Sequence, residues 1–285
     1  MLSDITRYLV CPVCRAGLAM GAGVVRCAAG HSFDIAKQGY VSLLVGSRPP
    51  GTADSAEMVA ARAAFLEAGH YAPLARALAE TVGQAGVIVD AGAGTGYYLH
   101  AVLGDAAGIA FDVSKHAIKR AARIPGRVGA FVADVWQPLP IADGVADAVL
   151  NVFAPRNGPE FARILRPGGA LVVVTPGPGH LRPLVDELGL LSVDEDKERR
   201  LARSLPGFSE ISRREVAFDL ELTGAEVSEV VGMGPSAWHT DAAELERRIS
   251  GYISQNAAGN PEKVLVTAEF NLSIFETAPS ASAVP

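Results

Sequence analysis

Short apolar runs alternate with longer amphipathic stretches through the middle of the chain. Turn residues bound these runs, which is the pattern of buried parallel strands joined by crossover helices. The sequence therefore predicts an α/β fold with a mostly parallel sheet. The predicted strands cover residues 87–90, 109–112, 130–134, 148–153 and 170–175.

Two later stretches, 214–222 and 264–275, alternate apolar with polar residues instead. Alternation with a period of two indicates strands with one face in water, so we expect them to form an antiparallel edge of the sheet. Helices are predicted over residues 57–67, from Pro73 onward, and over the charged stretch 194–203.

The first 45 residues lack this alternation of strands and helices. Short β-prone runs at 24–26 and 40–45 are separated by turns, which predicts a ribbon of short strands. A loop with adjacent prolines follows at 46–51, and we place a domain boundary there. The resulting division is a ribbon over residues 1–45, a helical linker over 46–85, a main domain over 86–277 and a disordered tail over 278–285.

The ribbon holds all three cysteines of the chain, which form the spacing C-x2-C-x12-C-x3-H with a histidine. Three thiolates and one imidazole are a ligand set that tetrahedral Zn²⁺ prefers. Four protein ligands leave no open position for water, so we expect the metal to be structural rather than catalytic. The predicted ligands are Cys11, Cys14, Cys27 and His31.

At 285 residues the chain is long enough for one full-size domain and a small appendage. Charged residues interrupt every apolar run before it reaches the roughly 20 residues of a membrane span, and the start does not resemble a secretory leader. An odd number of cysteines, gathered in one cluster, argues against a disulfide framework. We therefore expect a cytoplasmic protein with no membrane partner.

The net charge of −6 disfavours nonspecific binding to polyanions, but the charge is unevenly distributed. Residues 1–50 are basic, whereas the remainder of the chain is acidic. Any nucleic acid is therefore expected to contact the ribbon. The charged residues of this segment are Arg7, Arg15, Arg26, Lys37 and Arg48 against Asp4 and Asp34.

A glycine-rich turn containing Gly92, Gly94 and Gly96 follows the first predicted strand. It lacks both the G-x-G-x-x-G dinucleotide fingerprint and the Gly-Lys-Ser/Thr ending of a phosphate-binding loop, so a phosphate ligand is not favoured. Glycines at such a turn let main-chain N–H groups approach a ligand with no Cβ in the way. A carboxylate is the ligand group that suits this place.

Each of the first three predicted strands ends in an aspartate, namely Asp90, Asp112 and Asp134. Ligands of open α/β sheets bind beyond the carboxyl ends of the strands, so these carboxylates are expected to converge on one crevice. Asp112 is placed to accept hydrogen bonds from both hydroxyls of a ribose. Asp134 and the main chain of Val135 are expected to contact the edge of an adenine.

In this order and spacing, the glycine turn and the aspartates resemble the cofactor site of class I S-adenosylmethionine-dependent methyltransferases, as does the turn at 165–170. The resemblance implies a Rossmann-like methyltransferase fold preceded by a zinc ribbon. Further segments are similar to the bacterial 23S rRNA (guanine-N1)-methyltransferases, a family with Cys3His ligands at this spacing. These segments are residues 31–44, 54–58, 65–71, 153–155 and 175–181.

This resemblance implies methyl transfer from S-adenosylmethionine to N1 of a guanine in a hairpin loop of 23S rRNA. One branch of the family confers resistance to tylosin-type macrolides, and segment 233–238 is closer to that branch. The linker 46–85 would then be a lid over the cofactor. By resemblance, Tyr71, Gly94, Thr95, Gly96, Tyr97 and His180 line the cofactor pocket, and Asn151, Phe153 and Pro155 hold the target nitrogen.

Several of these residues also have simpler interpretations. Tyr71 fits a core aromatic after a helix, and His180 fits an exposed imidazole in a loop of prolines and glycines. Phe153 and Trp238 are candidate platforms for a splayed guanine, but each fits core packing as well. The overall acidity implies that affinity for RNA rests on a few well-placed cations, or on two copies of the chain in a homodimer.

Three other functions fit part of the sequence. They are a nicotinamide-dependent dehydrogenase, a small-molecule methyltransferase with the zinc ribbon as a lid, and a nucleic-acid-binding regulator that has lost activity. If ribbon and main domain act independently, replacing Cys11 by serine should abolish RNA binding and leave cofactor binding intact.

Overall fold

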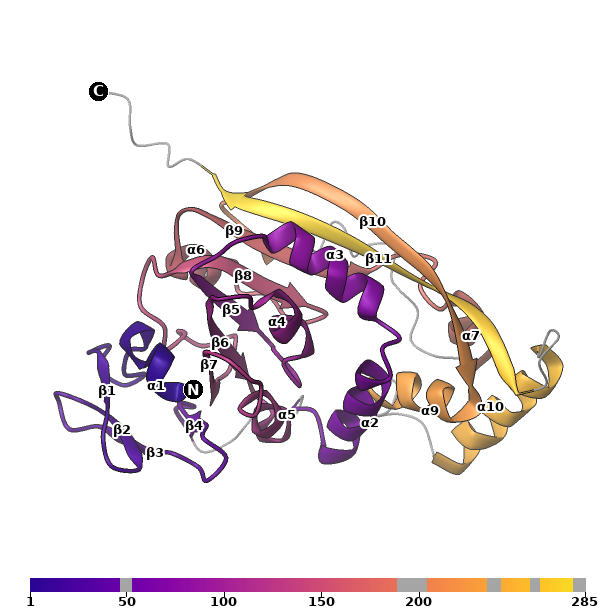
Figure 1. Ribbon diagram of the computed structural model, residues 1–285, viewed down its shortest axis with the longest axis horizontal. Helices are drawn as coiled ribbons and strands as arrows, with labels where there is room; N and C mark the ends of the chain where they lie inside the picture. The colour runs from indigo at the N-terminus through magenta and orange to yellow at the C-terminus, as the bar shows by residue number, and fades with distance from the viewer. Residues whose placement is uncertain (47–52, 189–203, 235–241, 257–261, 279–285) are drawn as a thin grey trace.

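The computed structural model describes residues 1–46, 53–188, 204–234, 242–256 and 262–278 (Figure 1). The predicted helix 194–203, Trp238 and all but the first residue of the predicted tail lie outside these ranges. Within them the strands form an eight-stranded sheet, in the order β10-β11-β9-β8-β5-β6-β7-β4, and a three-stranded sheet, β1-β2-β3.

The centre of the large sheet is parallel, which confirms the predicted α/β class. The third strand ends earlier than predicted, so Asp134 lies in the turn beyond it rather than at the strand end. The strands are β5 (Val87–Ala91), β6 (Ala107–Asp112), β7 (Val128–Val132), β8 (Ala146–Val152) and β9 (Leu165–Pro176).

The antiparallel edge is also confirmed. Strand β11 (Lys263–Thr277) lies between β9 and β10 (Phe208–Thr223) and is antiparallel to both. Alternate residues of β11 are buried, from Val264 to Leu272, as period-two patterning requires. Helices α9 (Gly224–Gly232) and α10 (Ala242–Asn256) lie in sequence between these two strands.

Each face of the large sheet is buried in a hydrophobic core of its own, and successive residues of β5 show this. Ile88 belongs to the core under the helices α2, α3 and α4, whereas Val89 belongs to the core that also contains α6. The helices that follow or precede these strands are α2 (Ala56–Glu67), α3 (Ala72–Val82), α4 (Tyr97–Val102), α5 (Lys115–Ala121), α6 (Gly158–Ile164) and α7 (Arg182–Leu188).

The N-terminal segment packs directly on the second face of the sheet. Ile5 and Leu9 are buried in one core with Phe131 of β7, and Gly129 lets Ile5 approach because a Cβ there would lie 2.2 Å from it. The segment contains α1 (Leu2–Ile5), η1 (Thr6–Tyr8), β1 (Leu18–Met20), β2 (Val24–Cys27) and β3 (Ser32–Asp34).

One element of the N-terminal segment lies at the edge of the large sheet. The β-prone stretch 40–45, predicted to lead out of the ribbon, forms only the short strand β4 (Val41–Ser42), which pairs in parallel with β7, and Val41 also forms an isolated antiparallel bridge with Ile35. The apolar run that suggested a strand is explained by burial of Val41 and Leu43 in the shared core. Within the described residues, no helix combines the length and apolarity needed to cross a membrane.

Candidate active site and metal centre

The four predicted metal ligands come together at one point of the ribbon. Their ligand atoms all lie within 4.8 Å of one another, with 3.6 Å between Cys11 Sγ and His31 Nδ1 and 3.6 Å between Cys14 Sγ and Cys27 Sγ. Zn–S and Zn–N bonds of about 2.3 and 2.0 Å in a tetrahedron imply ligand separations of roughly 3.5 to 3.8 Å. The donor set and its geometry therefore fit Zn²⁺.

The first ligand turn closes by hydrogen bonds around Cys11. Its N–H donates to the carbonyl of Ala16 over 2.7 Å, and its carbonyl accepts from the N–H of Arg15. Arg15 has a φ of 61°, the left-handed conformation that favours glycine.

A cavity of about 570 Å³ opens beyond the carboxyl ends of the parallel strands, at the place predicted for the ligand. Its volume is in the range of small-molecule and cofactor sites. It brings together most of the predicted site residues, but neither Gly96 nor Asn151 lines it. The predicted residues that do so are Tyr71, Asp90, Gly92, Gly94, Thr95, Tyr97, Asp112, Asp134, Val135, Phe153, Pro155 and His180.

Two glycines of the turn after β5 are required by close packing. Gly92 has a φ of 78°, and a Cβ there would lie 2.5 Å from the Cβ of Ala154. Gly96 is the N-cap of α4, and a Cβ there would lie 2.2 Å from Ile124. Gly96 therefore lets α4 pack against the end of α5. This packing explains the need for glycine at a position that does not line the cavity.

The carboxylate of Asp112 accepts hydrogen bonds from the main chain of this glycine turn and of the turn after β6. Its two carboxylate oxygens accept from the N–H of Gly94 over 2.9 Å and from the N–H of Ser114 over 2.8 Å. Burial raises the pKa of Asp112, and these two hydrogen bonds oppose the rise. The carboxylate keeps further lone pairs for ligand hydroxyls, since each oxygen accepts only one of these bonds.

Asp90 is the most buried acid of the cavity, with 2% of its surface exposed. Burial, and secondarily the charge of Asp112, raises the pKa of Asp90 to about 7, although a backbone hydrogen bond from Leu99 favours ionisation. The pKa of this carboxyl therefore lies close to neutral pH.

The raised pKa of Asp90 predicts a pH-dependent stability. The unfolded carboxyl ionises near pH 3.8 and the folded one near pH 7, so between these values the folded protein holds a proton that the unfolded chain has lost. Stability should therefore fall as the pH rises through this window, by up to about 4 kcal/mol from this group. Replacing Asp90 by asparagine should remove that fall.

Urea unfolding of both proteins between about pH 5 and about pH 8 measures this difference. The free energy of unfolding of Asp90→Asn, relative to that of the original chain, should increase with pH. The same difference for Asp105→Asn, at an exposed site, should show no such trend. An advantage that stays constant or shrinks with pH would show that Asp90 titrates normally.

The turn after β8 forms another part of the cavity wall, beside the glycine turn at Gly92. Phe153 has a φ of 56° and is 44% exposed, and its ring centroid lies 6.2 Å from Tyr98 and 5.4 Å from Phe270. A strained aromatic residue held at a cavity rim is a candidate for contact with a substrate.

Asn151 supports this turn from beneath rather than facing the cavity. It is fully buried, and its amide donates to the carbonyls of Ala91 over 3.3 Å and Pro155 over 2.8 Å. Its Oδ1 has no hydrogen-bond partner among the described residues. The geometry therefore does not favour the predicted direct contact between Asn151 and the target nitrogen, because the amide is occupied by main-chain carbonyls.

Tyr71 and His180 meet at a third wall. The Tyr71 hydroxyl lies 3.4 Å from Nε2 of His180, and Nδ1 of His180 accepts from the N–H of Glu269 over 3.2 Å. The Glu269 side chain lies under the loop before His180, where a Cβ on Gly177 would come within 2.2 Å of it. Tyr71 is buried in the core, which agrees with its interpretation as a core aromatic. His180 contacts Tyr71 and Glu269, so the alternative of an exposed loop imidazole does not describe it.

Several lining residues were not foreseen from the sequence. Arg62 of α2 pairs with Asp54 and donates to the carbonyl of Met233 over 2.9 Å, and its Nη1 lies above Gly94. Trp136 is 61% exposed at the rim. The hydroxyl of Tyr98 is buried in the wall with no partner among the described residues, as expected of a site that takes a polar ligand.

The sequence matches known proteins along most of its length. The model of the RlmA N-terminal zinc ribbon matches residues 9–46, and that of a methyltransferase domain matches residues 89–173. The chain is 50% identical to the 23S rRNA (guanine(748)-N(1))-methyltransferase of Streptomyces fradiae over 88% of its own length and 92% of that protein. The chain belongs to the 23S rRNA (guanine-N1)-methyltransferases.

A second relative, a Micromonospora griseorubida protein assigned to the same activity, is 49% identical over 96% of this chain and 99% of its own. A Bacillus halodurans protein assigned as a methyltransferase gives a TM-score of 0.50 at 15% identity, over 72% of this chain and 99% of that one, which supports the fold alone. The predicted family, enzyme class, cofactor and zinc are confirmed, and the dehydrogenase and inactive-regulator alternatives are not supported.

Proposed function

We propose that this methyltransferase modifies N1 of guanine 748 in a hairpin loop of 23S rRNA, like its Streptomyces fradiae relative. The cavity is the observation that carries the proposal. It brings together the glycine turn, the buried Asp90, the half-buried Asp112 and the exposed aromatic ring of Phe153. Such a cavity can hold a cofactor and leave its reactive end open to a base.

We assign the cofactor contacts from this geometry. The glycine turn and Arg62 would face the methionine carboxylate, because the guanidinium of Arg62 lies beside Gly94 and can pair with an anionic group there. Asp112 would accept from the ribose hydroxyls. Asp134 and Val135, at the cavity wall beyond β7, would contact the adenine. The segment 46–85, which carries α2, would cover the bound cofactor.

S-adenosylmethionine supplies an electrophilic methyl group when bound. The residues of this chain would position the acceptor in line with it, and positioning alone can lower the barrier substantially. Phe153 would stack on a guanine splayed out of the hairpin loop, while Pro155 shapes the turn beside it. Asn151 would act as a positioning residue for this turn. Guanine N1 must also lose its proton before or during the transfer.

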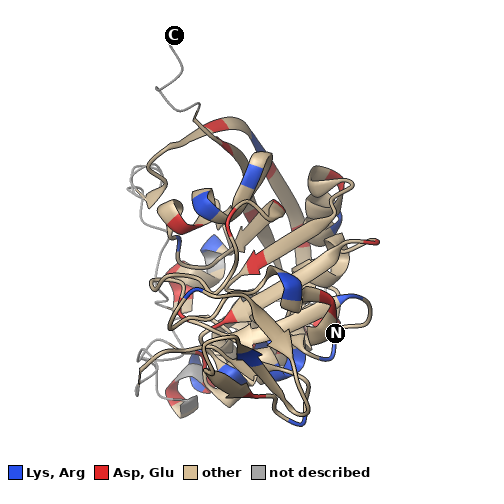
Figure 2. Cartoon of the chain, turned by 90° about the vertical axis from the view of Figure 1, so that its left-hand side faces the viewer, with Lys and Arg blue, Asp and Glu red and all other residues tan. Residues whose placement is uncertain are grey.

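The charges of the ribbon support a modest contribution to RNA binding. Figure 2 views the molecule from the side where the ribbon lies, and basic and acidic positions are interspersed over that side. Arg7, Arg26 and Lys37 are exposed on the ribbon, whereas Arg48 lies outside the described residues. We propose that residues 1–45 contact the RNA through these cations rather than through one continuous basic surface.

Reverse transcription of 23S rRNA tests the function. After incubation with the protein and S-adenosylmethionine, cDNA synthesis should stop beside guanine 748, because a methyl group on N1 blocks Watson–Crick pairing. RNA carrying adenine at this position is the matched control and should give no stop. A stop at another guanine would contradict the position, and the absence of any cofactor-dependent stop would contradict the function.

Phe153→Ala should weaken methylation by about tenfold or more, since stacking of one base on an aromatic ring contributes roughly 1 to 3 kcal/mol. The loss should appear in KM for RNA or in kcat, with S-adenosylmethionine affinity unchanged within about twofold. Ile211→Ala removes a similarly exposed apolar side chain from β10 and should have no effect. Unchanged methylation by Phe153→Ala would exclude the stacking role.

The remaining parts of the proposal follow from the substrate. A ribosomal RNA substrate would place the protein in the cytoplasm, and the modification would protect ribosomes against tylosin-type macrolides. Growth on tylosin of a sensitive strain that expresses the protein tests the resistance.

A homodimer would double the number of cations available to the RNA. Light scattering after size-exclusion chromatography tests whether the protein forms this dimer.

A further inference from the structure

The turn and loop after β7 connect the cavity to the zinc ribbon, and we call residues 134–142 the bridging segment. At one end Val135 and Trp136 line the cavity. At the other end Ile141 forms an antiparallel bridge with Leu9, two residues before the first zinc ligand. The N–H of Val10 donates to the carbonyl of Pro140 over 3.1 Å. One short segment therefore touches both the cavity and the metal-holding part of the chain.

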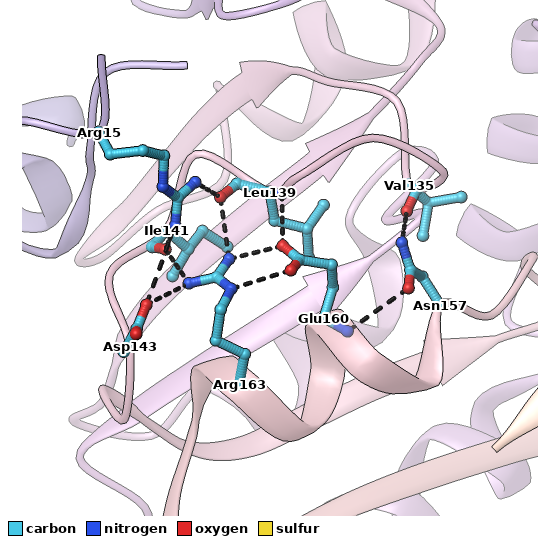
Figure 3. Close-up of polar contacts among 8 residues, drawn as sticks. All are labelled: Arg15, Val135, Leu139, Ile141, Asp143, Asn157, Glu160 and Arg163. Carbon is cyan, nitrogen blue, oxygen red and sulfur yellow. Dashed lines mark hydrogen bonds and ion pairs between the residues drawn. The ribbon is translucent and has the colours of Figure 1, made fainter. Parts of the chain in front are cut away.

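Two arginines from different parts of the chain bind the same carbonyls of this segment (Figure 3). Arg15, between the ligands Cys14 and Cys27, donates to Leu139 O over 2.7 Å and to Ile141 O over 3.4 Å. Arg163 of α6 donates to the same two oxygens over 3.0 and 2.8 Å. The bridging segment is thus clamped between the ribbon and α6.

Helix α6 fixes the cavity end of the segment as well. Its N-cap residue Asn157 donates through Nδ2 to Val135 O over 2.8 Å, and Oδ1 accepts from the N–H of Glu160. Glu160 accepts from Leu139 N over 2.6 Å and pairs with Arg163. Burial alone would raise the pKa of Glu160, but the bonds from Arg163 and Leu139 lower it, so this carboxylate stays ionised.

We propose that Arg15 is a positioning residue for the cofactor, which couples the zinc turn to the adenine end of the cavity through the bridging segment. The inference depends on the cofactor site proposed above. Arg15 directly follows the ligand Cys14, and its left-handed backbone belongs to the turn that carries Cys11 and Cys14. Zinc that orders this turn would therefore restrict the main chain from which the guanidinium extends. Loss of its two bonds leaves the carbonyls of Leu139 and Ile141 with Arg163 alone as a side-chain donor, although the main-chain bridge from Leu9 to Ile141 remains. The main chain of Val135 and Trp136 then has more freedom.

Such coupling is reciprocal, because two ligands that favour one conformation of the same segment strengthen each other's binding equally. Zinc in its site should therefore strengthen cofactor binding, and the cofactor should strengthen zinc binding. The coupling acts partly through the contacts of Arg15, so it should weaken when these contacts are removed while both sites remain present.

Arg15→Ala in the full chain tests the coupling, with Arg26→Ala as the matched control. Arg26 carries the same charge on β2 of the same ribbon and is exposed. Both variants should keep one zinc per chain. Calorimetry should show S-adenosylmethionine affinity about fivefold weaker for Arg15→Ala and unchanged for Arg26→Ala. If the original chain fails to bind the cofactor, the proposed function fails. If it binds and both variants bind equally well, the coupling is wrong.

Two further measurements need no assay of methyl transfer. In a Trp238→Phe background Trp136 is the sole remaining tryptophan, and Arg15→Ala should increase the mobility of Trp136 seen by fluorescence anisotropy. Equilibrium competition with a zinc chelator should show tighter zinc binding when S-adenosylmethionine is present, and a smaller gain in Arg15→Ala. Equal gains in the two proteins would overturn the proposal.

Discussion

Replacing Asp112 by asparagine is expected to weaken S-adenosylmethionine binding by about a hundredfold. One carboxylate now accepts from Gly94 and Ser114 at once, whereas asparagine offers one oxygen and turns an N–H₂ donor toward the other backbone N–H. Hydrogen bonds to charged groups contribute roughly 1.5 to 3 kcal/mol each, and about 2.7 kcal/mol corresponds to a factor of one hundred. The substitution also removes the proposed acceptor for the ribose hydroxyls.

Calorimetric titration measures this loss directly. Asp105→Asn makes the same chemical change at an exposed position just before β6 and should bind the cofactor as the original chain does. The circular dichroism spectra of both variants should match that of the original chain. If Asp112→Asn folds and keeps its affinity within about threefold, Asp112 does not organise the cofactor site.

Removal of the zinc, or replacement of Cys11 by serine, should destabilise the whole molecule. Cys11 is fully buried in the same core as Val25 of the ribbon and Phe131 of β7. Zinc binding to such ribbons contributes roughly 10 kcal/mol or more to folding, so its loss exceeds the stability of a typical domain. The sequence suggested that the ribbon and the main domain act independently. We instead expect both to be destabilised, because residues of the ribbon and of the sheet share one core.

Differential scanning calorimetry should show a single transition in the original chain and a much lower Tm, or no transition, in Cys11→Ser. Val13→Ala alters an exposed apolar residue between two ligands and should leave the Tm unchanged. The idea of a shared core is contradicted if Cys11→Ser shows an undisturbed upper transition that still shifts with S-adenosylmethionine.

Much of the cavity lining proposed to hold the cofactor could be predicted because its signals are local. Strand β6 is a continuous apolar run that ends in Asp112, and Gly92 and Gly94 come directly after β5. Parallel strands bring their carboxyl ends to one edge, so residues at these ends meet in the folded chain. The zinc ligands could be predicted equally well, because the spacing C-x2-C-x12-C-x3-H alone defines the two turns that hold them.

Contacts between distant segments could not be predicted in this way. Arg15 is 124 residues from Leu139, and Arg62 is 171 residues from Met233, so no periodicity or spacing relates them. A long polar side chain in a turn or on a helix is usually a solvated one. For Trp136 there was a signal, because a large aromatic residue directly follows the predicted adenine contacts Asp134 and Val135.

The partner strand of β4 and the hydrogen bonds of Asn151 could not be predicted, for a similar reason. The run around Val41 was correctly recognised as apolar, but its partner β7 lies almost a hundred residues away, and no local pattern selects that partner. Asn151 ends a buried strand like the aspartates, and its position suggested a substrate contact. Its amide instead donates to the carbonyls of Ala91 and Pro155. Buried carbonyls need hydrogen-bond donors, but the sequence does not show which carbonyls will be buried beside Asn151.

The place of β11 in the sheet has a consequence for biosynthesis. This strand inserts between β9 and β10, and it carries Phe270 and Glu269, on which Tyr71 and His180 rest. During translation the glycine turn and its aspartates leave the ribosome long before residues 263–277 do. A nascent chain therefore lacks one wall of its cavity until this strand has emerged, so the proposed cofactor site can be completed only after residues 263–277 have been synthesised.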